Sequence, residues 1–385
     1  MKRFGFLMAA VMAVGGAFAE TTINIKDSGA EQFPVCVEVK GNPAFKRTLE
    51  RNLVLSGAFR LVANAPLKVT GTTGGQVEVT GGGKRLAMVS RAADDKAART
   101  EARLLSDKMC ETYANQKGFA NDRIAFVVKN GKAEELCVGY ADGGDVRQLT
   151  QDKKASVGPR WKNASTIYYT GYLNNAPQIF EIDAVTGQRR LAWGFGGLTT
   201  GAAVSPDGGQ VAIILSKPFG NPELCLINPG SGTWTRLTTT KAANEGQPSW
   251  GPDGKSIVYV SDESRNPHLY IINTATKAKR RLTSTGRQNV DPDWGSDGRI
   301  VYTCLRDGQR QIAVVNPAEP AAVRYVTEPG KWEHPTWSRD RRHVIAECDG
   351  ALYLIDTLDR GDGKPVKPVK LFTVPGKCIN PAWSR

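Results

Sequence analysis

Side chains that could do chemistry are few in this sequence, and none of them completes a known catalytic motif. The chain has three histidines, and one of them, His334, directly follows Glu333. This pair lacks a nucleophile, and the sequence contains no G-x-S-x-G elbow, no H-E-x-x-H motif and no phosphate-binding loop. Carboxylates such as Asp291 and Glu333 could serve a carbohydrate-active enzyme. Because no spacing requires that chemistry, we predict no catalytic residue and favour a binding function.

The seven cysteines predict neither a metal site nor a cofactor site. The sequence has no C-x-x-C pair, and three histidines give little support for zinc. An odd number of cysteines leaves at least one thiol unpaired. Cys304 and Cys348 fall at matching places in the internal repeat described below, so a disulfide between them is conceivable, although burial as small apolar side chains explains the cysteines equally well. No cofactor and no metal are expected.

Amide and carboxylate side chains recur in a different pattern, close to each copy of that repeat. The candidates for one shared polar surface are Asn244, Glu245, Gln247, Asn289, Asp291, Glu333, His334 and Asn380. Such a surface suits a protein or peptide that presents cations and backbone groups. The alternative is that each of them is a solvated loop residue, so the hypothesis depends on the elements that bring them together.

The repeat is anchored by Pro-x-Trp, followed in most copies by Ser or Gly and often by Asp-Gly. One degenerate copy has Val204 where the others have Trp161, Trp250, Trp294, Trp337 and Trp383. The copies follow one another at intervals of 43 to 46 residues. A repeat of about 40–50 residues with several short strands is typical of a propeller blade. We expect each tryptophan to fill the space between neighbouring sheets and each Asp-Gly to form the turn between the first two strands.

The two ends of the repeat region complete each other. Residues 123–150 contain three strand patterns with no anchor before them, whereas Trp383 belongs to an anchor with no strands after it. Pairing of the C-terminal segment with the strand that begins at Ile124 would leave no unpaired sheet edge. We therefore predict a six-bladed β-propeller over residues 121–385, closed by the C-terminal strand. The loops that enter the innermost strands would bring the polar candidates to one mouth of its channel.

The region before the propeller mixes helical and strand periods. A strand pattern covers residues 33–39, and Asn42 is placed to cap a helix that ends near Gly57. Further strand patterns, separated by glycine clusters, precede a second helix predicted over about 97–113. Residues 33–120 are therefore expected to form a small α/β domain in front of a mainly β chain.

The first nineteen residues have the features of an export signal. Lys2 and Arg3 precede an apolar run that is shorter than the roughly 20 residues needed to span a membrane. The segment Ala17-Phe18-Ala19 is the small-x-small pattern that signal peptidase recognises. Cleavage is therefore expected between Ala19 and Glu20, which predicts an exported mature protein.

The chain is basic, with a formal net charge of +13. Its basic residues are spread along the sequence, and no run of five or more occurs. Because an exported protein rarely meets nucleic acid, we expect a solvated basic surface and no nucleic-acid binding. Peripheral association with an anionic envelope surface is compatible with this charge.

The repeat and the order of parts resemble the TolB family, the exported propeller proteins of the Tol-Pal envelope system. The anchor at 248–255 reads Pro-Ser-Trp-Gly-Pro-Asp-Gly-Lys, and the chain ends in Pro-Ala-Trp-Ser-Arg. Peptidase propellers carry similar anchors, so the discrimination comes from the order: export signal, short polar segment, α/β domain, a helix leading into Phe-Ala-Asn-Asp-Arg-Ile-Ala-Phe-Val at 119–127, then six blades. The resemblance covers nearly the whole mature chain. The departures are Val204 and the Lys-Asn that follows Trp161.

The resemblance implies a non-enzymatic periplasmic hub that supports outer-membrane integrity and envelope constriction during cell division. TolB proteins bind the peptidoglycan-associated lipoprotein Pal through the channel mouth and TolA through the N-terminal segment, which is 20–32 here. An extended strip in that segment suits addition to the edge of a partner sheet. Its candidate contact residues are Glu20, Thr22, Ile23, Ile25 and Asp27. A monomer is expected.

Two other functions stay open at this point. One is a carbohydrate-active or peptidase-associated propeller enzyme, which is weaker because no hydrolase domain remains once six blades and the α/β domain are assigned. The other is a binding module for cell-wall fragments. Capture of partners from an envelope extract would separate these functions from the interaction hub.

Overall fold

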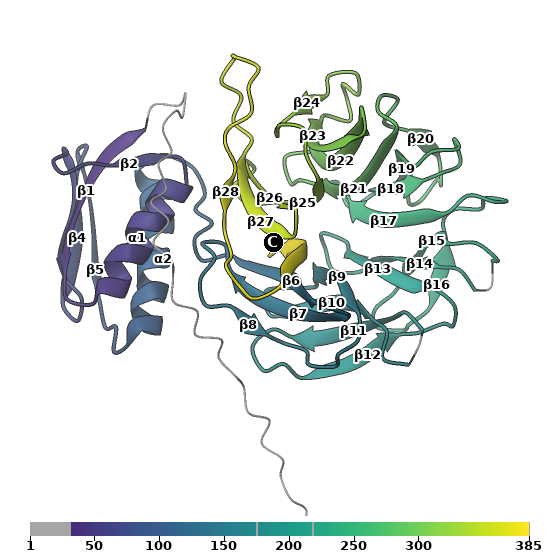
Figure 1. The fold of residues 1–385 in the computed structure, drawn as a ribbon, viewed down its shortest axis with the longest axis horizontal. Helices are drawn as coiled ribbons and strands as arrows, with labels where there is room; N and C mark the ends of the chain where they lie inside the picture. The colour runs from purple at the N-terminus through teal and green to yellow at the C-terminus, as the bar shows by residue number, and fades with distance from the viewer. Residues whose placement is uncertain (1–31, 175, 218, 385) are drawn as a thin grey trace, which may run out of the picture.

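The computed structural model describes residues 32–384 except 175 and 218, and it has two parts (Figure 1). The N-terminal part is one sheet covered on one face by two helices, and the larger part is a ring of six small sheets. The two helices lie between the N-terminal sheet and the ring. The fold is therefore mainly β, a six-bladed propeller preceded by a small α/β domain, and the predicted fold class is confirmed.

The N-terminal domain is built on a five-stranded sheet with the strand order β2-β1-β3-β4-β5. β1 pairs in parallel with β2 and β3, whereas β3, β4 and β5 pair antiparallel. The elements in chain order are β1 (Phe33–Lys40), α1 (Pro43–Leu55), β2 (Phe59–Leu61), β3 (Leu67–Thr72), β4 (Gln76–Gly81), β5 (Lys84–Val89) and α2 (Asp95–Tyr113).

Both helices begin at capping side chains. The Asn42 side chain accepts a hydrogen bond from the Ala44 N–H, and the Asp94 side chain accepts one from the Ala97 N–H. Gly57, just after α1, has a φ of 66°, the left-handed conformation that commonly ends a helix. The predicted start of α1 at Asn42 is therefore confirmed.

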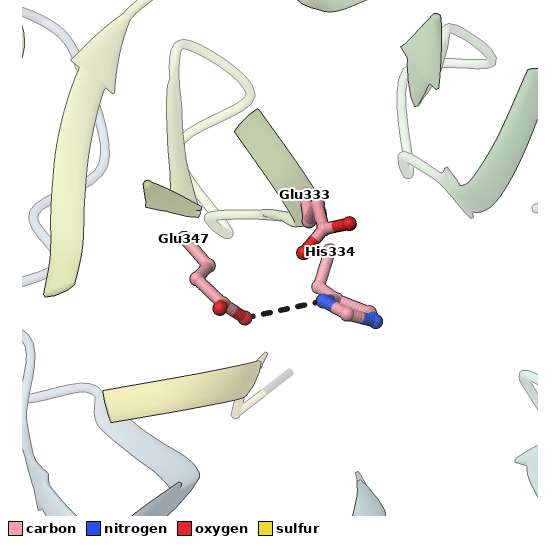
Figure 2. Close-up of side chains that lie close together, drawn as sticks. All are labelled: Glu333, His334 and Glu347. Atoms are coloured by element: carbon pink, nitrogen blue, oxygen red, sulfur yellow. Dashed lines mark hydrogen bonds and ion pairs between the residues drawn. The ribbon is translucent and has the colours of Figure 1, made fainter. Parts of the chain in front are cut away.

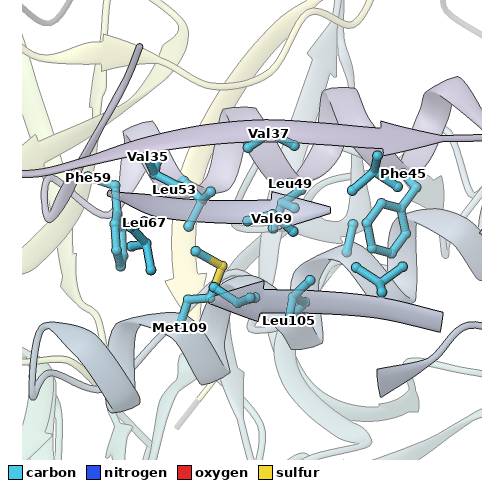
Figure 3. Close-up of a cluster of buried hydrophobic side chains, with 14 of the residues drawn as sticks. Val35, Val37, Phe45, Leu49, Leu53, Phe59, Leu67, Val69, Leu105 and Met109 are labelled. Carbon is cyan, nitrogen blue, oxygen red and sulfur yellow. The ribbon is translucent and has the colours of Figure 1, made fainter. Parts of the chain in front are cut away.

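One apolar core joins these helices to the sheet (Figure 3). The helical spacing of Phe45, Leu49 and Leu53 places all three on the buried face of α1, where none of them is exposed. The other face of each helix is free to meet the propeller. Buried members from the sheet and α2 include Val35, Val37, Leu67, Val69, Leu105 and Met109.

The propeller consists of six sheets of four antiparallel strands, which we number as blades from the one that contains β6, the first propeller strand in the chain. Blade 1 is β29 (Lys377–Trp383), β6 (Arg123–Asn130), β7 (Ala133–Tyr140) and β8 (Arg147–Gln148). Blade 2 is β9 (Ser156–Trp161), β10 (Thr166–Gly171), β11 (Gln178–Asp183) and β12 (Arg189–Trp193). Blade 3 is β13 (Thr199–Val204), β14 (Val211–Leu215), β15 (Glu223–Ile227) and β16 (Trp234–Arg236).

The remaining blades follow the same order from the innermost strand outward. Blade 4 is β17 (Glu245–Trp250), β18 (Ser256–Ser261), β19 (His268–Asn273) and β20 (Lys279–Arg281). Blade 5 is β21 (Gln288–Trp294), β22 (Ile300–Arg306), β23 (Gln309–Val315) and β24 (Arg324–Tyr325). Blade 6 is β25 (Trp332–Trp337), β26 (His343–Cys348), β27 (Ala351–Asp356) and β28 (Val369–Lys370).

The ring is closed by its two ends. β29 pairs antiparallel with β6, with Trp383 opposite Ile124, which is the pairing that the unmatched ends of the repeat predict. The Trp383 Nε1 donates a hydrogen bond to the Asp122 carboxylate at 3.0 Å, and the Ser384 N–H donates to the Arg123 carbonyl at 2.8 Å. The last and the first strands of the repeat region thus share one blade.

The anchor residues hold neighbouring blades together. The Trp250 Nε1 donates a hydrogen bond to the Ala203 carbonyl of the preceding blade at 2.9 Å, and the Trp161 Nε1 donates to the Ala382 carbonyl at 3.0 Å. In the turn that follows Trp250, Asp253 Oδ1 accepts hydrogen bonds from two backbone N–H groups. Four of the five anchor tryptophans are buried: Trp250, Trp294, Trp337 and Trp383.

A polar interface attaches the α/β domain to blade 1. Arg103 of α2 is 1% exposed, and its guanidinium donates to the carboxylates of Asp142 at 2.8 Å and Asp145 at 2.7 Å, between β7 and β8. Its carbon Cζ lies 3.9 Å from the centre of the Tyr140 ring. Arg51 of α1 adds a hydrogen bond to the Asp142 carbonyl at 2.7 Å. The helix faces that do not enter the apolar core therefore bind the propeller.

All seven cysteines are unpaired, so the disulfide considered between Cys304 and Cys348 does not form. Cys304 is buried and Cys348 is half-buried, which agrees with the alternative that these residues pack as small apolar side chains. Between residues 32 and 384, neither helix is long and apolar enough to cross a membrane.

Candidate functional site

The innermost strand of every blade is irregular at the same place. Its register with the second strand shifts there, and one residue in or beside the shifted stretch has a left-handed backbone with φ between 50° and 76°. A bulge of this kind re-aims the backbone and side chain of the affected residue. These residues, which we call the channel ring, are Gly158, Gly201, Gln247, Asp291, His334 and Asn380.

Hydrogen bonds join successive members of the channel ring. The Asp291 N–H donates to Gln247 Oε1 at 2.9 Å, and the His334 N–H donates to Asp291 Oδ2 at 3.2 Å. The Gln247 amide also donates to Asp291 Oδ1. Farther round, the Gly158 N–H donates to Asn380 Oδ1 at 3.5 Å. The side chain of one blade thus accepts from the backbone of the next blade.

The channel ring lines a cavity of about 330 Å³. Its wall is polar where Gln247, Asp291, His334 and Asn380 contribute and is more open beside Gly158, where an added Cβ would meet no atom within 4 Å. A cavity of this size is large enough to receive a few side chains of a partner. Other lining residues are Arg160, Leu198, Thr200, Ile214 and Glu245.

His334 supplies a positive charge to this cavity. Its Nδ1 lies 3.2 Å from Glu347 Oε2, which reaches it from the neighbouring strand (Figure 2), and its Nε2 lies 3.7 Å from Asp291 Oδ1. Burial lowers the pKa of the imidazole, but Asp291, Glu347 and Glu333 together outweigh that effect and raise it to about 9. The imidazole is therefore protonated near neutral pH and stands among carboxylates. Glu347 also accepts from the Asn380 N–H at 3.3 Å.

Glu245 is a buried carboxyl in the wall of the cavity. The residue is 3% exposed, and neither of its carboxylate oxygens has a hydrogen-bond partner among the described residues. Burial raises the pKa of Glu245 to about 7; the nearby Ser261 hydroxyl opposes this effect, and the charges of Glu223 and Glu263 reinforce it. Near neutral pH this carboxyl is therefore partly protonated.

Comparison with known proteins identifies the family. Residues 110–385 match the family model described as the TolB beta propeller domain. The chain belongs to the TolB family. A Tol-Pal system protein TolB of Bordetella parapertussis is 27% identical over 412 aligned positions, covering 86% of this chain and 93% of that protein. The TolB of Chromobacterium violaceum is 28% identical over 50% of this chain and 54% of its own length.

Solved TolB structures share the fold. The crystal structure of TolB from Acinetobacter baumannii superimposes with a TM-score of 0.81 at 20% identity, covering 92% of this chain and 97% of that chain. A structure described as putative TolB from Agrobacterium tumefaciens gives a TM-score of 0.54 at 19% identity over 68% of this chain. The resemblance to the TolB family that the sequence indicated is therefore confirmed, and the relatives are named as components of the Tol-Pal system.

In this TolB-family chain, half of the predicted channel-mouth residues lie together. Gln247, Asp291, His334 and Asn380 are the four members of the channel ring that carry side chains, and all four line the cavity. Asn289 lies elsewhere: it is fully buried and its amide donates to the Thr285 carbonyl at 2.8 Å. We therefore leave Asn289 out of the proposed partner contacts.

The other predicted mouth residues are already engaged or buried. The Asn244 amide donates to Asp262 at 2.9 Å, and the Glu333 carboxylate pairs with Arg310. Glu245 lines the cavity, but its burial makes a charged replacement at this position a test of folding as well as of binding. The predicted cleavage residues and TolA contacts, which are Ala19, Glu20, Thr22, Ile23, Ile25 and Asp27, lie outside the described residues.

Sequence reasoning missed Gly158, Gly201 and Arg160 as cavity residues, and it missed Glu347 as the partner of His334. The two glycines carried a usable signal, since each lies three residues before the anchor Trp161 or Val204, at the place that Gln, Asp, His or Asn fills in the other copies. Residues of these types tolerate a left-handed backbone best. Glu347 gave no such signal, because it lies on the second strand of its blade and reaches His334 only through the pairing of the two strands.

One group of described residues could hold a metal ion. One ligand atom from each of Glu333, His334 and Glu347 lies within 4.8 Å of the others. The Glu333 carboxylate is already paired with Arg310, and a protonated imidazole does not coordinate a metal. A cation would therefore have to displace both the imidazole proton and the guanidinium. The contacts of the three residues are explained without a metal.

Proposed function

We propose that this protein is a non-enzymatic interaction hub of the periplasm that works within the Tol-Pal system. In this proposal the channel-ring cavity binds Pal, and the N-terminal segment 20–32 binds TolA by adding a strand to it. The protein would thereby support outer-membrane integrity and envelope constriction during cell division. Family membership and the names of the relatives support the system; the polar cavity supports the manner of binding.

The state of Asp291 and Glu333, the two carboxylates considered for catalysis, favours binding over hydrolysis. Asp291 accepts hydrogen bonds from Gln247, Thr303 and the His334 N–H, so its lone pairs already hold the blades in register. Glu333 is paired with Arg310. A glycosidase needs one carboxyl as acid and another as base or nucleophile beside the substrate. Neither residue is available in that way, which weakens the carbohydrate-active alternative.

A binding measurement with purified Pal that lacks its lipid tests the channel site. His334→Asn removes the positive charge, and Asn is a residue type that tolerates the left-handed backbone of this position. We expect titration calorimetry to show affinity weakened by about tenfold or more, which is at least about 1.4 kcal/mol. Lys255→Ala, in the exposed turn after β17 and hence at the other end of that strand, is the control and should bind as the wild type does. Equal affinity of all three proteins would contradict the proposed site.

A deletion tests the division of labour between the two partners. A mature protein that lacks residues 20–31 keeps β1 and the hydrogen bond from the Gln32 side chain to the Gly57 carbonyl at 3.2 Å. We expect it to lose binding to the C-terminal domain of TolA, because no segment remains to add a strand, and to bind Pal with unchanged affinity. Loss of both partners in a variant with wild-type thermal stability would contradict separate binding sites.

A further inference from the structure

The backbone N–H groups of the channel ring form a set of hydrogen-bond donors. Four of them, one in each of blades 5, 6, 1 and 2, meet side-chain acceptors. The Asp291 N–H meets Gln247, the His334 N–H meets Asp291, and the Gly158 N–H meets Asn380. In blade 1 the Asn380 N–H meets Glu347 in place of a ring residue. The backbone N–H groups of the channel ring therefore have side-chain acceptors in four consecutive blades.

This series of donor and acceptor pairs is interrupted where two successive channel-ring residues, Gly158 and Gly201, are glycine. By the same geometry, the acceptor for the Gly201 N–H would come from position 158, and the acceptor for the Gln247 N–H would come from position 201. Glycine has no side chain to supply it. Among the described residues, neither of these N–H groups donates a hydrogen bond to a side-chain acceptor of the protein. The two donors therefore lie in blades 3 and 4, and the gap left by their missing acceptors lies in blades 2 and 3.

The same gap is where the cavity has room. A Cβ on Gly158 would meet no atom within 4 Å, and Gly158, Gly201 and Gln247 all line the cavity. The opposite side of the ring is filled by Asp291, His334 and Asn380. An inserted group would therefore be directed off the channel axis, toward blades 2 and 3.

We propose that a binding partner places an amide carbonyl oxygen in this gap, where it accepts hydrogen bonds from the Gly201 and Gln247 N–H groups and completes the channel ring. The inference rests on the proposed binding of Pal and adds which chemical group enters the cavity and on which side. An amide oxygen matches the acceptors on both sides of the gap, because the Asp291 N–H meets the amide oxygen of Gln247 and the Gly158 N–H meets that of Asn380. The oxygen could belong to an Asn or Gln side chain or to the backbone of an inserted loop.

Amide NMR spectra of the full mature chain test this directly. On addition of lipid-free Pal, the Gly201 and Gln247 amide protons should move downfield and become protected from exchange, because each gains an acceptor. The Asp291 and His334 amides already have acceptors and serve as internal controls, with little change expected. If Pal binds while the Gly201 and Gln247 amides stay unshifted and unprotected, the inference is wrong and the proposed function stands. If Pal does not bind at all, the proposed function itself fails.

A variant of this protein can itself supply the missing hydrogen-bond acceptor. Gly158→Asn places an amide side chain at a position with φ of 57° and open space, as Asn380 does in its own blade with φ of 50°. In the free variant the Gly201 amide should already be shifted downfield, and Pal affinity should fall by about tenfold or more because the gap is filled. Gly254→Asn, at φ of 63° and also with no atom within 4 Å, is the matched control in the turn after β17.

A smaller replacement distinguishes the effect of an added hydrogen-bond acceptor from the effect of lost space in the cavity. Gly158→Ala adds one methyl group and no acceptor, so it should leave the Gly201 amide as in the free wild type and retain most of the affinity. Tight binding by Gly158→Asn would overturn the inference. Substitution of each Asn and Gln by Ala on the TolB-facing surface of Pal then identifies the source. Loss of the Gly201 shift in one variant assigns a side chain, and its persistence in all of them assigns a backbone carbonyl.

Discussion

The residue three places before each anchor tryptophan, or before Val204 in blade 3, decides both the shape and the charge of the channel. It occupies a left-handed backbone position in all six blades, and that conformation restricts the residue types that fit without strain. Within that restriction the chain places Gly twice and Gln, Asp, His and Asn once each. A repeated structural position thus becomes a varied surface, in which each blade contributes a different chemical group to one cavity.

The protonation of His334 gives a prediction at this scale. Its pKa is raised to about 9 in the folded protein, from an ordinary value of about 6.5, because Asp291 and Glu347 stabilise the cation. The stabilisation is complete below pH 6.5 and is lost as the pH rises through 9. We expect the free energy of unfolding to fall by about 1–2 kcal/mol over that range, after allowance for partial solvent screening. Chemical denaturation at several pH values measures it.

His334→Asn is the comparison for that experiment, because it removes the titrating group and keeps a residue that accepts the backbone conformation. Its stability should change less than that of the wild type between pH 6.5 and 9. The NMR titration of the His334 ring protons gives the pKa independently. A titration midpoint near or below 6.5 would contradict the electrostatic argument, whatever the stability curves show.

At the scale of elements, the repeat in the sequence is sufficient to predict the blades. The anchors at Trp250 and Trp294 fall at the ends of innermost strands, as their spacing predicts, and Trp383 pairs with the first blade. The bulges could not be predicted in the same way, because a shift of register depends on the pairing of two strands and on the neighbouring blade. The candidate site was therefore predicted as a set of loops, whereas its centre is a row of bulges inside the strands.

The interface of the α/β domain was likewise missed, for a physical reason. The apolar stripe of α2 predicts which face enters the core of its own domain, and that prediction agrees with the burial of Ala98, Ala102 and Met109. Arg103 lies on the other face, where an arginine is usually solvated. Its burial follows from two aspartates 39 and 42 residues later in the chain, and no local pattern connects them to the helix.

The closing strand gives a prediction at this scale through its contact with the linker that follows α2. The buried carboxyl of Asp122 accepts from the Trp383 Nε1. Asp122→Ala should lower the free energy of unfolding by about 1–3 kcal/mol, because it leaves the buried indole N–H without an acceptor. Asp122→Asn keeps an acceptor oxygen and is the control. Urea denaturation at pH 4 should therefore rank the wild type and Asp122→Asn together, above Asp122→Ala.

The stabilities of the wild type and Asp122→Asn should also differ in how they depend on pH. Burial raises the pKa of Asp122 to about 7, an effect that Arg339 and the Trp383 N–H only partly offset. A raised carboxyl pKa favours the folded state below the ordinary value near 4, and that advantage is lost as the pH rises through 7. Asp122→Asn should consequently become more stable than the wild type at pH 8. Equal stabilities of the two at pH 4 and at pH 8 would show that the carboxyl is not perturbed.

At the scale of the whole molecule, the two domains are joined mainly by charge. Arg103 and Asp142 are 1% and 4% exposed, respectively, and Asp145 receives a second ion pair from Arg99 at 2.6 Å. A buried ion pair costs much desolvation to form, but removal of one partner is costly because it strands the other. The contact therefore favours one arrangement of the two domains. It holds the α/β domain, which begins directly after segment 20–32, in a fixed position on blade 1.

Arg103→Met tests whether this contact makes the molecule unfold as a unit. Methionine keeps much of the length of the side chain but leaves Asp142 buried without its charged partner, so we expect a loss of about 3–5 kcal/mol. Scanning calorimetry should show one transition for the wild type and two for the variant, because the domains no longer stabilise each other. Arg85→Met removes an exposed ion pair to Glu78 within the α/β domain and should cost less than about 1 kcal/mol with a single transition retained. If Arg103→Met also melts in a single transition close to that of the wild type, the apolar contacts of Leu55 with blades 1 and 6 are sufficient to hold the domains together, and the buried charges are not what couples them.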